Sequence, residues 1–242
     1  MSKKVLPYKD SSLGKKEQVT QMFDDISENY DGLNRIISLG IDKKWRKRVV
    51  NIVKEARSET ILDVATGTGD LAIALAKTGA KKITAVDIAS KMLHIGQQKV
   101  EQKGLTGKIE MLLADSEQLP FPDNSFDAVT VAFGVRNFEH LEKGLTELYR
   151  VLKPGGTFVV LETSVPEKTP YKQGYSFYAK IILPFMGRVF SGSRSAYTYL
   201  SKSASVFPYG TDFNNILQKT GFIEILHKPQ TFGVATIYVA LK

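Results

Sequence analysis

The stretch Ile61-Leu-Asp-Val-Ala-Thr-Gly-Thr-Gly-Asp70 passes from an apolar, strand-like segment through a glycine-rich loop into a predicted helix. Gly67 and Gly69 have no Cβ atom, so the backbone can turn sharply there and its N–H groups can approach a ligand closely. In open parallel sheets, ligands bind outside the carboxyl ends of the strands, which is where this loop lies. The stretch therefore predicts an α/β fold with a binding site at this loop.

Short β-branched runs alternate with helical stretches from residue 60 onward. Such alternation, with strands that are apolar along their length, indicates βαβ units and a parallel sheet covered on both faces. The expected strands are 60–64, 83–87, 109–113, 126–133, 157–163, 222–227 and 234–241. The last two are so close that they suit an antiparallel pair, because a parallel return needs a dozen or more residues. The expected fold class is α/β, a doubly wound, mostly parallel seven-stranded sheet with an antiparallel last strand.

Helical segments precede and interrupt this sheet within a single domain, residues 1–242. Residues 1–56 are expected to form an N-terminal helical extension, with helices over 15–27 and 30–38 and a helix over 43–56 that Asp42 caps. The expected parts that follow are a cofactor-binding core over 57–165, a helical insertion covering the substrate over 166–220, and the final strand pair over 221–242.

The composition excludes several classes of protein. The chain has no cysteine, which rules out disulfide scaffolds, thiolate metal sites and cysteine nucleophiles, and which fits a reducing cytoplasm. The net charge of +8 favours anionic partners. No apolar run approaches the ~20 residues that a membrane-spanning helix needs, so the protein is expected to be soluble or to lie on a membrane surface. No cluster of carboxylates and histidines suits Mg²⁺, and no metal is expected.

Acidic residues follow successive predicted strands. Asp87 ends the second strand, where a carboxylate can accept both hydroxyls of a ribose, and Asp115 with Ser116 follows the third, where an adenine amino group would lie. Asp63 and Asp70 bracket the glycine loop with negative charge, which suits the ammonium and sulfonium of S-adenosylmethionine and opposes a pyrophosphate. The loop also satisfies the loose dinucleotide fingerprint, so a non-catalytic module that binds NAD or FAD is an alternative.

These motifs together resemble a known family. The segments 63–69, 119–127 and 151–156, with the acidic residues just named, are similar to class I S-adenosylmethionine-dependent methyltransferases. Over almost the whole chain, the sequence resembles the ubiquinone/menaquinone biosynthesis C-methyltransferases. That finer resemblance rests on Met22–Asn34, Ser38-Leu-Gly40, Trp45-Arg46, Phe133-Gly-Val-Arg-Asn137, Leu161-Glu-Thr-Ser164, Tyr197-Thr-Tyr-Leu200 and Phe207-Pro208.

The resemblance implies methylation of a ring carbon of a polyprenylated quinol, with S-adenosylmethionine as methyl donor. Demethylmenaquinol becoming menaquinol is the favoured reaction, and methylation of the benzoquinol on the ubiquinone route is the alternative. The expected cofactor-binding residues are Gly67, Thr68, Gly69, Asp87, Asp115 and Ser116. Many members of the family have serine where this chain has Ala132, so a hydroxyl contact is lost there.

Arg136 and Asn137 are the candidate catalytic residues. Ionisation of a ring hydroxyl pushes electron density onto the attacking carbon, and Arg136 can stabilise the resulting phenolate while Asn137 orients it or a bridging water. The resemblance also implies an arginine that acts through water; a guanidinium is a poor proton acceptor, so we favour the electrostatic role. An ion pair at a strand end is the alternative role for Arg136. Tyr30, Asp31 and Glu162 are further candidates for handling the proton.

The insertion has an unusual composition. Residues 171–211 include five basic residues and no acidic one, and residues 171–213 hold 11 of the 24 aromatic residues. This suits a cap over a large apolar substrate that rests on an anionic membrane surface. A nucleic-acid groove, as in an RNA methyltransferase, and a lid packed on its own sheet are the alternatives.

The sequence therefore predicts a polyprenylated quinol and a membrane surface as partners, with no nucleic acid. A homodimer is compatible with it. The expected location is the cytoplasm, with peripheral attachment to the inner face of the cell membrane.

Overall fold

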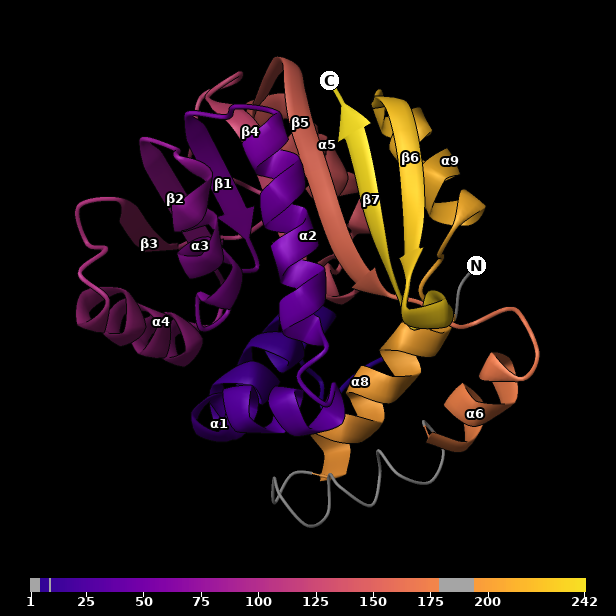
Figure 1. The fold of residues 1–242 in the computed structure, drawn as a ribbon. Coiled ribbons are helices and arrows are strands. Elements are labelled where there is room, and N and C mark those ends of the chain that lie inside the picture. Colours follow the sequence, from indigo (N-terminus) through magenta and orange to yellow (C-terminus); the bar gives the residue numbers. More distant parts are fainter. Residues whose placement is uncertain (1–4, 9, 179–193) are drawn as a thin grey trace.

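A computed structural model describes residues 5–8, 10–178 and 194–242 (Figure 1). Seven strands form one sheet in the order β3-β2-β1-β4-β5-β7-β6. The strands are β1 (Thr60–Val64), β2 (Lys82–Asp87), β3 (Ile109–Leu113), β4 (Phe126–Ala132), β5 (Leu152–Thr163), β6 (Ile223–Gln230) and β7 (Ala235–Leu241). Strands β1 to β5 pair in parallel, whereas β7 is antiparallel to both β5 and β6. The expected fold class is confirmed.

The central strands are apolar along their length because helices cover both faces of the sheet. Successive residues of a strand point to opposite faces. In β5, Phe158 and Val160 belong to one buried cluster, and Val159 and Leu161 belong to the other. This is why the strands read as continuous apolar runs rather than as an alternating pattern.

The helices divide between the two faces and one end of the sheet. Helices α2 (Asp42–Glu55), α3 (Asp70–Leu75) and α4 (Ser90–Gln102) pack on one face, and α5 (Leu141–Val151) and α9 (Thr211–Thr220) pack on the other. Figure 1 shows α1 (Lys15–Ile37) and α8 (Arg194–Val206) crossing the carboxyl ends of the parallel strands, with α6 (Tyr171–Phe177) nearby.

A third buried cluster joins these end-covering helices to each other. It combines Val19, Met22 and Ile26 of α1 with Ala196 and Tyr199 of α8. The N-terminal extension and the helical insertion, far apart in sequence, therefore form one cover over the edge of the sheet where a ligand is expected.

Three expectations about local structure were wrong. The two short helices expected over 15–38 are one helix, α1, because no strong helix breaker interrupts its apolar face. Asp42 does not cap α2: it is the first helical residue, and its carboxylate accepts a hydrogen bond from Ser38 Oγ at 2.6 Å and pairs with Arg46. Strand β5 begins at Leu152 rather than at 157, because Leu152 already pairs with Phe126 before a shift of register.

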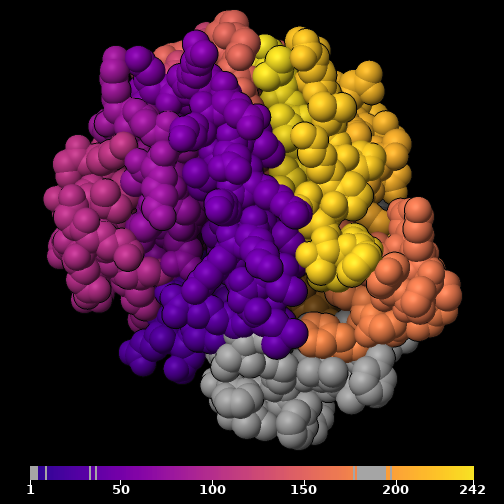
Figure 2. All heavy atoms as spheres, viewed as in Figure 1, coloured from indigo at the N-terminus to yellow at the C-terminus, as the bar shows by residue number. Residues whose placement is uncertain are grey.

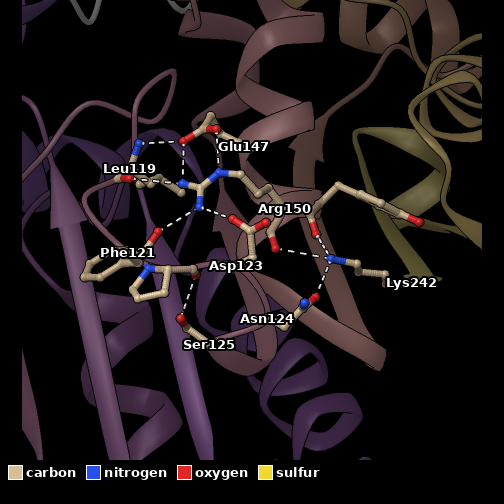
Figure 3. A network of polar contacts seen from close by, with 10 residues as sticks. Leu119, Phe121, Asp123, Asn124, Ser125, Glu147, Arg150 and Lys242 are labelled. Atoms are coloured by element: carbon tan, nitrogen blue, oxygen red, sulfur yellow. Dashed lines mark hydrogen bonds and ion pairs between the residues drawn. The ribbon is translucent and has the colours of Figure 1, made fainter.

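At the amino ends of β4 and β5, Arg150 joins the 119–127 loop to α5 (Figure 3). Its guanidinium donates to both carboxylate oxygens of Glu147 and to one of Asp123, each at 2.8 Å. It also donates to the carbonyls of Phe121 at 2.8 Å and Leu119 at 3.1 Å. The five N–H groups of an arginine thus all have partners. The 119–127 motif is therefore explained by its structural connection to α5.

In the described part of the chain, no helix is both long and apolar enough to cross a membrane. Of the five basic residues noted in the insertion, Lys180 and Arg188 lie outside the described residues.

Candidate active site

The glycine loop between β1 and α3 is pinned to the tip of the neighbouring strand. Gly67 and Gly69 have φ angles of +57° and +77°, a region that L side chains rarely adopt. The Gly67 N–H donates to Asp87 Oδ2 at 2.8 Å, and the Ala89 N–H donates to Asp87 Oδ1 at 2.9 Å. Burial raises the pKa of Asp87, which these two N–H groups oppose. The expected loop and the expected ribose-binding carboxylate are therefore in direct contact.

Three cavities lie at this edge of the sheet, and we name each after one lining residue. The Asp87 cavity is lined by Gly67, Asp87, Asp115 and Ser116, four of the expected cofactor residues. The Asp63 cavity lies along the glycine loop. The Tyr175 cavity lies under the helical cover. Tyr30 and Phe133 line all three, so the cavities meet at these two rings.

The other two expected cofactor residues lie differently. Thr68 lines the Asp63 cavity, and its hydroxyl donates to Asp31 at 2.6 Å. Gly69 lines none of the three cavities. It precedes α3, and a Cβ atom there would meet the side chain of Met111 at 3.4 Å. The absence of a side chain at Gly69 is therefore needed for the conformation of the loop.

Asp63 is a buried carboxylate at the bottom of the loop. Its two oxygens accept hydrogen bonds from Thr130 Oγ1 and Thr66 Oγ1, both at 2.7 Å. Burial raises its pKa to about 6 although both hydroxyls and the nearby Arg46 favour the ionised form. Asp63 therefore supports the loop from below and adds negative field to the Asp63 cavity.

Arg136 and Asn137 are neighbours in a short 3-10 turn after β4, but they line different cavities. Arg136 lines the Tyr175 cavity, and Asn137 lines the Asp87 cavity. Arg136 pairs with Glu162 at 2.6 Å, and both side chains are almost fully buried, at 7% and 0% exposed. The strand-end ion pair considered from the sequence is therefore present, and it does not occupy the whole guanidinium: Arg136 Nε is buried and has no partner among the described residues.

Arg136 is held as a cation. Burial alone lowers its pKa, but Glu162 and the neighbouring tyrosines outweigh burial and raise it. A guanidinium in this state does not accept a proton, which supports the electrostatic role. The Asn137 amide oxygen accepts a hydrogen bond from Tyr199 of α8 at 3.1 Å, so the insertion positions the second candidate residue.

Phe133 connects these groups through a strained backbone. It has a φ of +59°, which is rare for a residue with a side chain. Its carbonyl accepts hydrogen bonds from Arg136 Nη1 at 2.8 Å and from Asn137 Nδ2 at 3.3 Å, which offset the strain. Such strained residues are concentrated at functional sites.

The remaining proton-handling candidates are already engaged. Asp31 pairs with Lys99 of α4 at 2.7 Å and accepts the Thr68 hydroxyl, and Glu162 pairs with Arg136. Burial raises the pKa of Tyr30, which keeps its phenol neutral. Among the described residues, no cluster of histidine and acidic side chains is suited to a metal ion.

Sequence reasoning assigned no role to several residues that line or support the site. Lys99 bridges Asp31 and Asp70, and Arg46 lines both the Asp63 and the Tyr175 cavities. The spacing of 42, 46, 49 and 53 places Arg46 on the inward face of α2, a signal that was available. The roles of Lys99 and Tyr199 depend on their contacts with Asp31 and Asn137, which only the folded structure brings into reach.

Comparisons with known proteins agree with this geometry. The family model described as "ubiE/COQ5 methyltransferase family" matches residues 11–242. The chain is 46% identical over 241 residues to a demethylmenaquinone methyltransferase of Bacteroides fragilis, covering 99% of this chain and 98% of the relative. It is 41% identical over 242 residues to the ubiquinone/menaquinone biosynthesis C-methyltransferase UbiE of Geobacter sulfurreducens, covering 99% and 93%.

A solved structure of a SAM-dependent methyltransferase from Aquifex aeolicus matches with a TM-score of 0.53 at 22% identity, covering 76% of this chain and 81% of that one. At this identity the likeness concerns the fold alone. The near full-length family match, together with relatives above 40% identity, shows that this chain belongs to the ubiE/COQ5 methyltransferase family.

Proposed function

We propose that this protein transfers a methyl group from S-adenosylmethionine to a ring carbon of a polyprenylated quinol, converting demethylmenaquinol to menaquinol. The observation that carries the proposal is the meeting of the three cavities at Tyr30 and Phe133. A cavity suited to the donor thereby adjoins an apolar-walled one suited to the acceptor.

The Asp87 cavity fits the adenosyl part of the donor. Asp87 is placed to accept the ribose hydroxyls, Asp115 and Ser116 to contact the adenine amino group, and Ile88 and Met92 supply apolar surface for the base. The space beside Gly67 is open because this residue has no Cβ atom, so a ligand can approach the backbone of the glycine loop closely. When bound, S-adenosylmethionine supplies an already activated methyl group.

The Tyr175 cavity fits a large apolar acceptor. Its walls come from the N-terminal extension, the sheet and the insertion, and include Trp45, Tyr175, Tyr178 and Leu200. Burial raises the pKa of Tyr175 and Tyr178, so both phenols stay neutral at ordinary pH. An apolar cover excludes water and strengthens every electrostatic interaction inside.

Arg136 is the group that we assign to the developing phenolate. It is a buried cation that lines the Tyr175 cavity, and its Nε has no partner among the described residues. A fixed hydrogen-bond donor of this kind stabilises developing charge without reorganisation. Asn137 lines the Asp87 cavity, in which the methyl donor is proposed to bind, and is placed to align the two reacting molecules.

The test is incubation with S-adenosylmethionine and chemically reduced demethylmenaquinone, followed by mass spectrometry for the gain of one methyl group. The oxidised quinone is the matched control, because its ring is electron-poor; equal reaction of both forms contradicts the nucleophilic-ring mechanism. Faster reaction of the benzoquinol analogue would place the protein on the ubiquinone route. Binding of NAD or FAD in place of S-adenosylmethionine would overturn the proposal.

We also propose that the protein attaches to the inner face of the cell membrane from the cytoplasm. Leu39 and Phe232 are 81% and 67% exposed, and Phe232 stacks on Tyr171 with ring centroids 4.0 Å apart. Leu39 follows Ser38 in the sequence, and Phe232 lies two residues before Val234; Ser38 and Val234 both line the Tyr175 cavity. Figure 2 shows the indigo N-terminal segment, the orange α6 region and the yellow C-terminal strands meeting on one face.

Cosedimentation with anionic phospholipid vesicles tests this attachment. Replacing Leu39 and Phe232 together by serine is expected to release the protein, whereas Leu113→Ser, at an exposed residue on the opposite edge strand, is not. Unchanged sedimentation of the double variant would contradict the proposal.

A homodimer through β6 is our proposal for the oligomeric state. β6 is an edge strand with Ile223 and Leu226 exposed, and an unpaired edge can pair with a second copy. Sedimentation equilibrium of the wild type and of Leu226→Lys tests it.

A further inference from the structure

Arg46 lies at the boundary between two cavities. It comes from the inward face of α2, and its side chain is only 13% exposed. It lines the Asp63 cavity along the glycine loop and also the Tyr175 cavity. Its guanidinium carbon lies 5.7 Å from the centre of the Phe133 ring, and Phe133 also lines both cavities. The positive charge of Arg46 therefore lies beside the sites of both proposed ligands, S-adenosylmethionine and the quinol.

The acidic groups of the Asp63 cavity are already satisfied by the protein. Asp31 and Asp70 both pair with Lys99, at 2.7 Å and 2.6 Å, and Asp63 accepts two threonine hydroxyls. Arg46 acts on Asp63 and Asp70 through its charge, but its ion pair is with Asp42 and not with any of these three acids.

Arg46 itself is only partly satisfied. Its Nη1 pairs with Asp42, while its Nε is buried and has no partner among the described residues. Buried donors are rarely left without a partner, and a protein tolerates one where a ligand completes the bonding. Among the residues described as lining the Asp63 cavity, Arg46 is the one cation.

S-Adenosylmethionine, the methyl donor, carries a group that matches the cation of Arg46. Gly67 lines both the Asp87 and the Asp63 cavities, so a molecule whose adenosyl part lies beside Asp87 extends its amino-acid end into the Asp63 cavity. That end carries one ammonium and one carboxylate. The carboxylates of the cavity suit the ammonium, but they repel the carboxylate unless a cation lies beside it.

We propose that Arg46 binds the carboxylate of the methionyl part of S-adenosylmethionine, through its Nε and the rest of its guanidinium edge. This inference rests on the proposed function, because it needs the adenosyl part in the Asp87 cavity. It assigns the N-terminal extension a role in binding the donor as well as in covering the acceptor. A planar guanidinium is the side chain best matched to a carboxylate.

Calorimetric titration with two ligands tests the proposal. S-Adenosylhomocysteine carries the carboxylate, whereas 5′-methylthioadenosine keeps the adenosyl part and lacks the amino-acid end. Arg46→Gln is expected to raise the Kd of S-adenosylhomocysteine about 10- to 100-fold, the usual range for a charged hydrogen bond to a ligand, and to leave the Kd of 5′-methylthioadenosine within about twofold. Lys47→Gln, an exposed neighbour that makes the same charge change, is the matched control and is expected to alter neither.

The possible outcomes are distinct. Equal weakening of both ligands would mean that Arg46 only supports the fold, and unchanged binding of both together with a raised KM for the quinol would assign it to the acceptor; each overturns the inference while the proposed function stands. Failure of the wild type to bind either ligand would overturn the proposed function and this inference with it. Because 5′-methylthioadenosine reports an intact adenosyl site, a misfolded variant is recognised directly.

Discussion

The charged side chains at the two ends of the sheet differ in burial and in how completely they are hydrogen-bonded. At the amino ends of the strands, Arg150 has a partner for each of its N–H groups, whereas at the carboxyl ends Arg136 and Arg46 each keep a buried Nε without one among the described residues. The acids at the two ends both have hydrogen-bond partners and differ in burial instead. Asp127 accepts from Lys153 and Thr60, and its pKa falls to about 2, while burial raises the pKa of Asp63 to about 6.

This contrast separates groups that hold the fold from groups that are prepared for a ligand. A charge that serves stability is saturated with hydrogen bonds, because each unsatisfied buried donor costs free energy. Buried charged groups keep hydrogen-bonding atoms without partners only where function needs them. Variants at both ends of the sheet test that separation, and the largest effect is expected at Arg136.

Arg136→Gln is expected to lower kcat about 100- to 1000-fold, because it removes the cation assigned to the phenolate. It also leaves Glu162 buried without its partner, so the free energy of unfolding falls by about 3–5 kcal/mol. Methyl transfer to reduced demethylmenaquinone and urea denaturation measure the two effects.

The double variant Arg136→Gln/Glu162→Gln separates the two roles of Arg136. It removes the unpaired carboxylate, so the free energy of unfolding is expected to recover while kcat stays low. Recovery of kcat as well would show that Arg136 serves only to neutralise Glu162.

Asp63→Asn tests the raised pKa at the carboxyl ends. Because the folded-state pKa of Asp63 lies above the unfolded value, the wild type loses stability from this group as the pH rises from about 4 to 6. Relative to the wild type, the variant therefore gains up to about 3 kcal/mol between pH 4 and pH 7, measured by urea denaturation at both.

Asp127→Asn is the matched control at the amino ends and has the opposite sign. The lowered pKa of Asp127 contributes stability above pH 4 that is lost as the pH falls toward 2. The deficit of this variant is therefore expected to shrink on acidification. The same pH dependence for both variants would abolish the contrast between the two ends.

Arg150→Ala is expected to lower the free energy of unfolding by roughly 2–3 kcal/mol, because it releases the 119–127 loop from α5 (Figure 3). Arg150 lines none of the three cavities, so the Kd of S-adenosylhomocysteine should not change. A weakened Kd in the folded variant would show that the amino ends of the strands also influence the site.

Tyr199→Phe is expected to have the smallest effect. With a pKa of about 12, Tyr199 stays neutral and acts only as a donor to Asn137, a bond worth about 1 kcal/mol. We expect kcat to fall several-fold with little change in the Kd of the donor. Tyr149→Phe, in a residue that lines none of the three cavities, should leave kcat unchanged.

Patterns within short segments predicted most of the fold. The number of strands, their succession along the chain, the glycine loop and the antiparallel end of the sheet were expected correctly, although β5 begins five residues earlier and β6 ends three residues later than expected. Gly67, Asp87, Asp115 and Ser116 do line one cavity. These features depend on periodicity and on strand ends, which neighbouring residues determine. Asp42 was misjudged because its partner, Arg46, lies within the same helix and competes with capping.

The succession of strands along the chain and the carboxylates at the strand ends follow from the amino-acid sequence, because each is set by local propensity and by the rules of parallel sheets. The division of Arg136 and Asn137 between two cavities, the bridge from Asp31 to Lys99 and the place of Arg46 do not. These contacts join segments far apart in the chain, and they exist only because α1 and α8 pack over the end of the sheet and α2 packs on its face. Packing of that kind depends on the shapes of all the surfaces at once, which no single segment encodes.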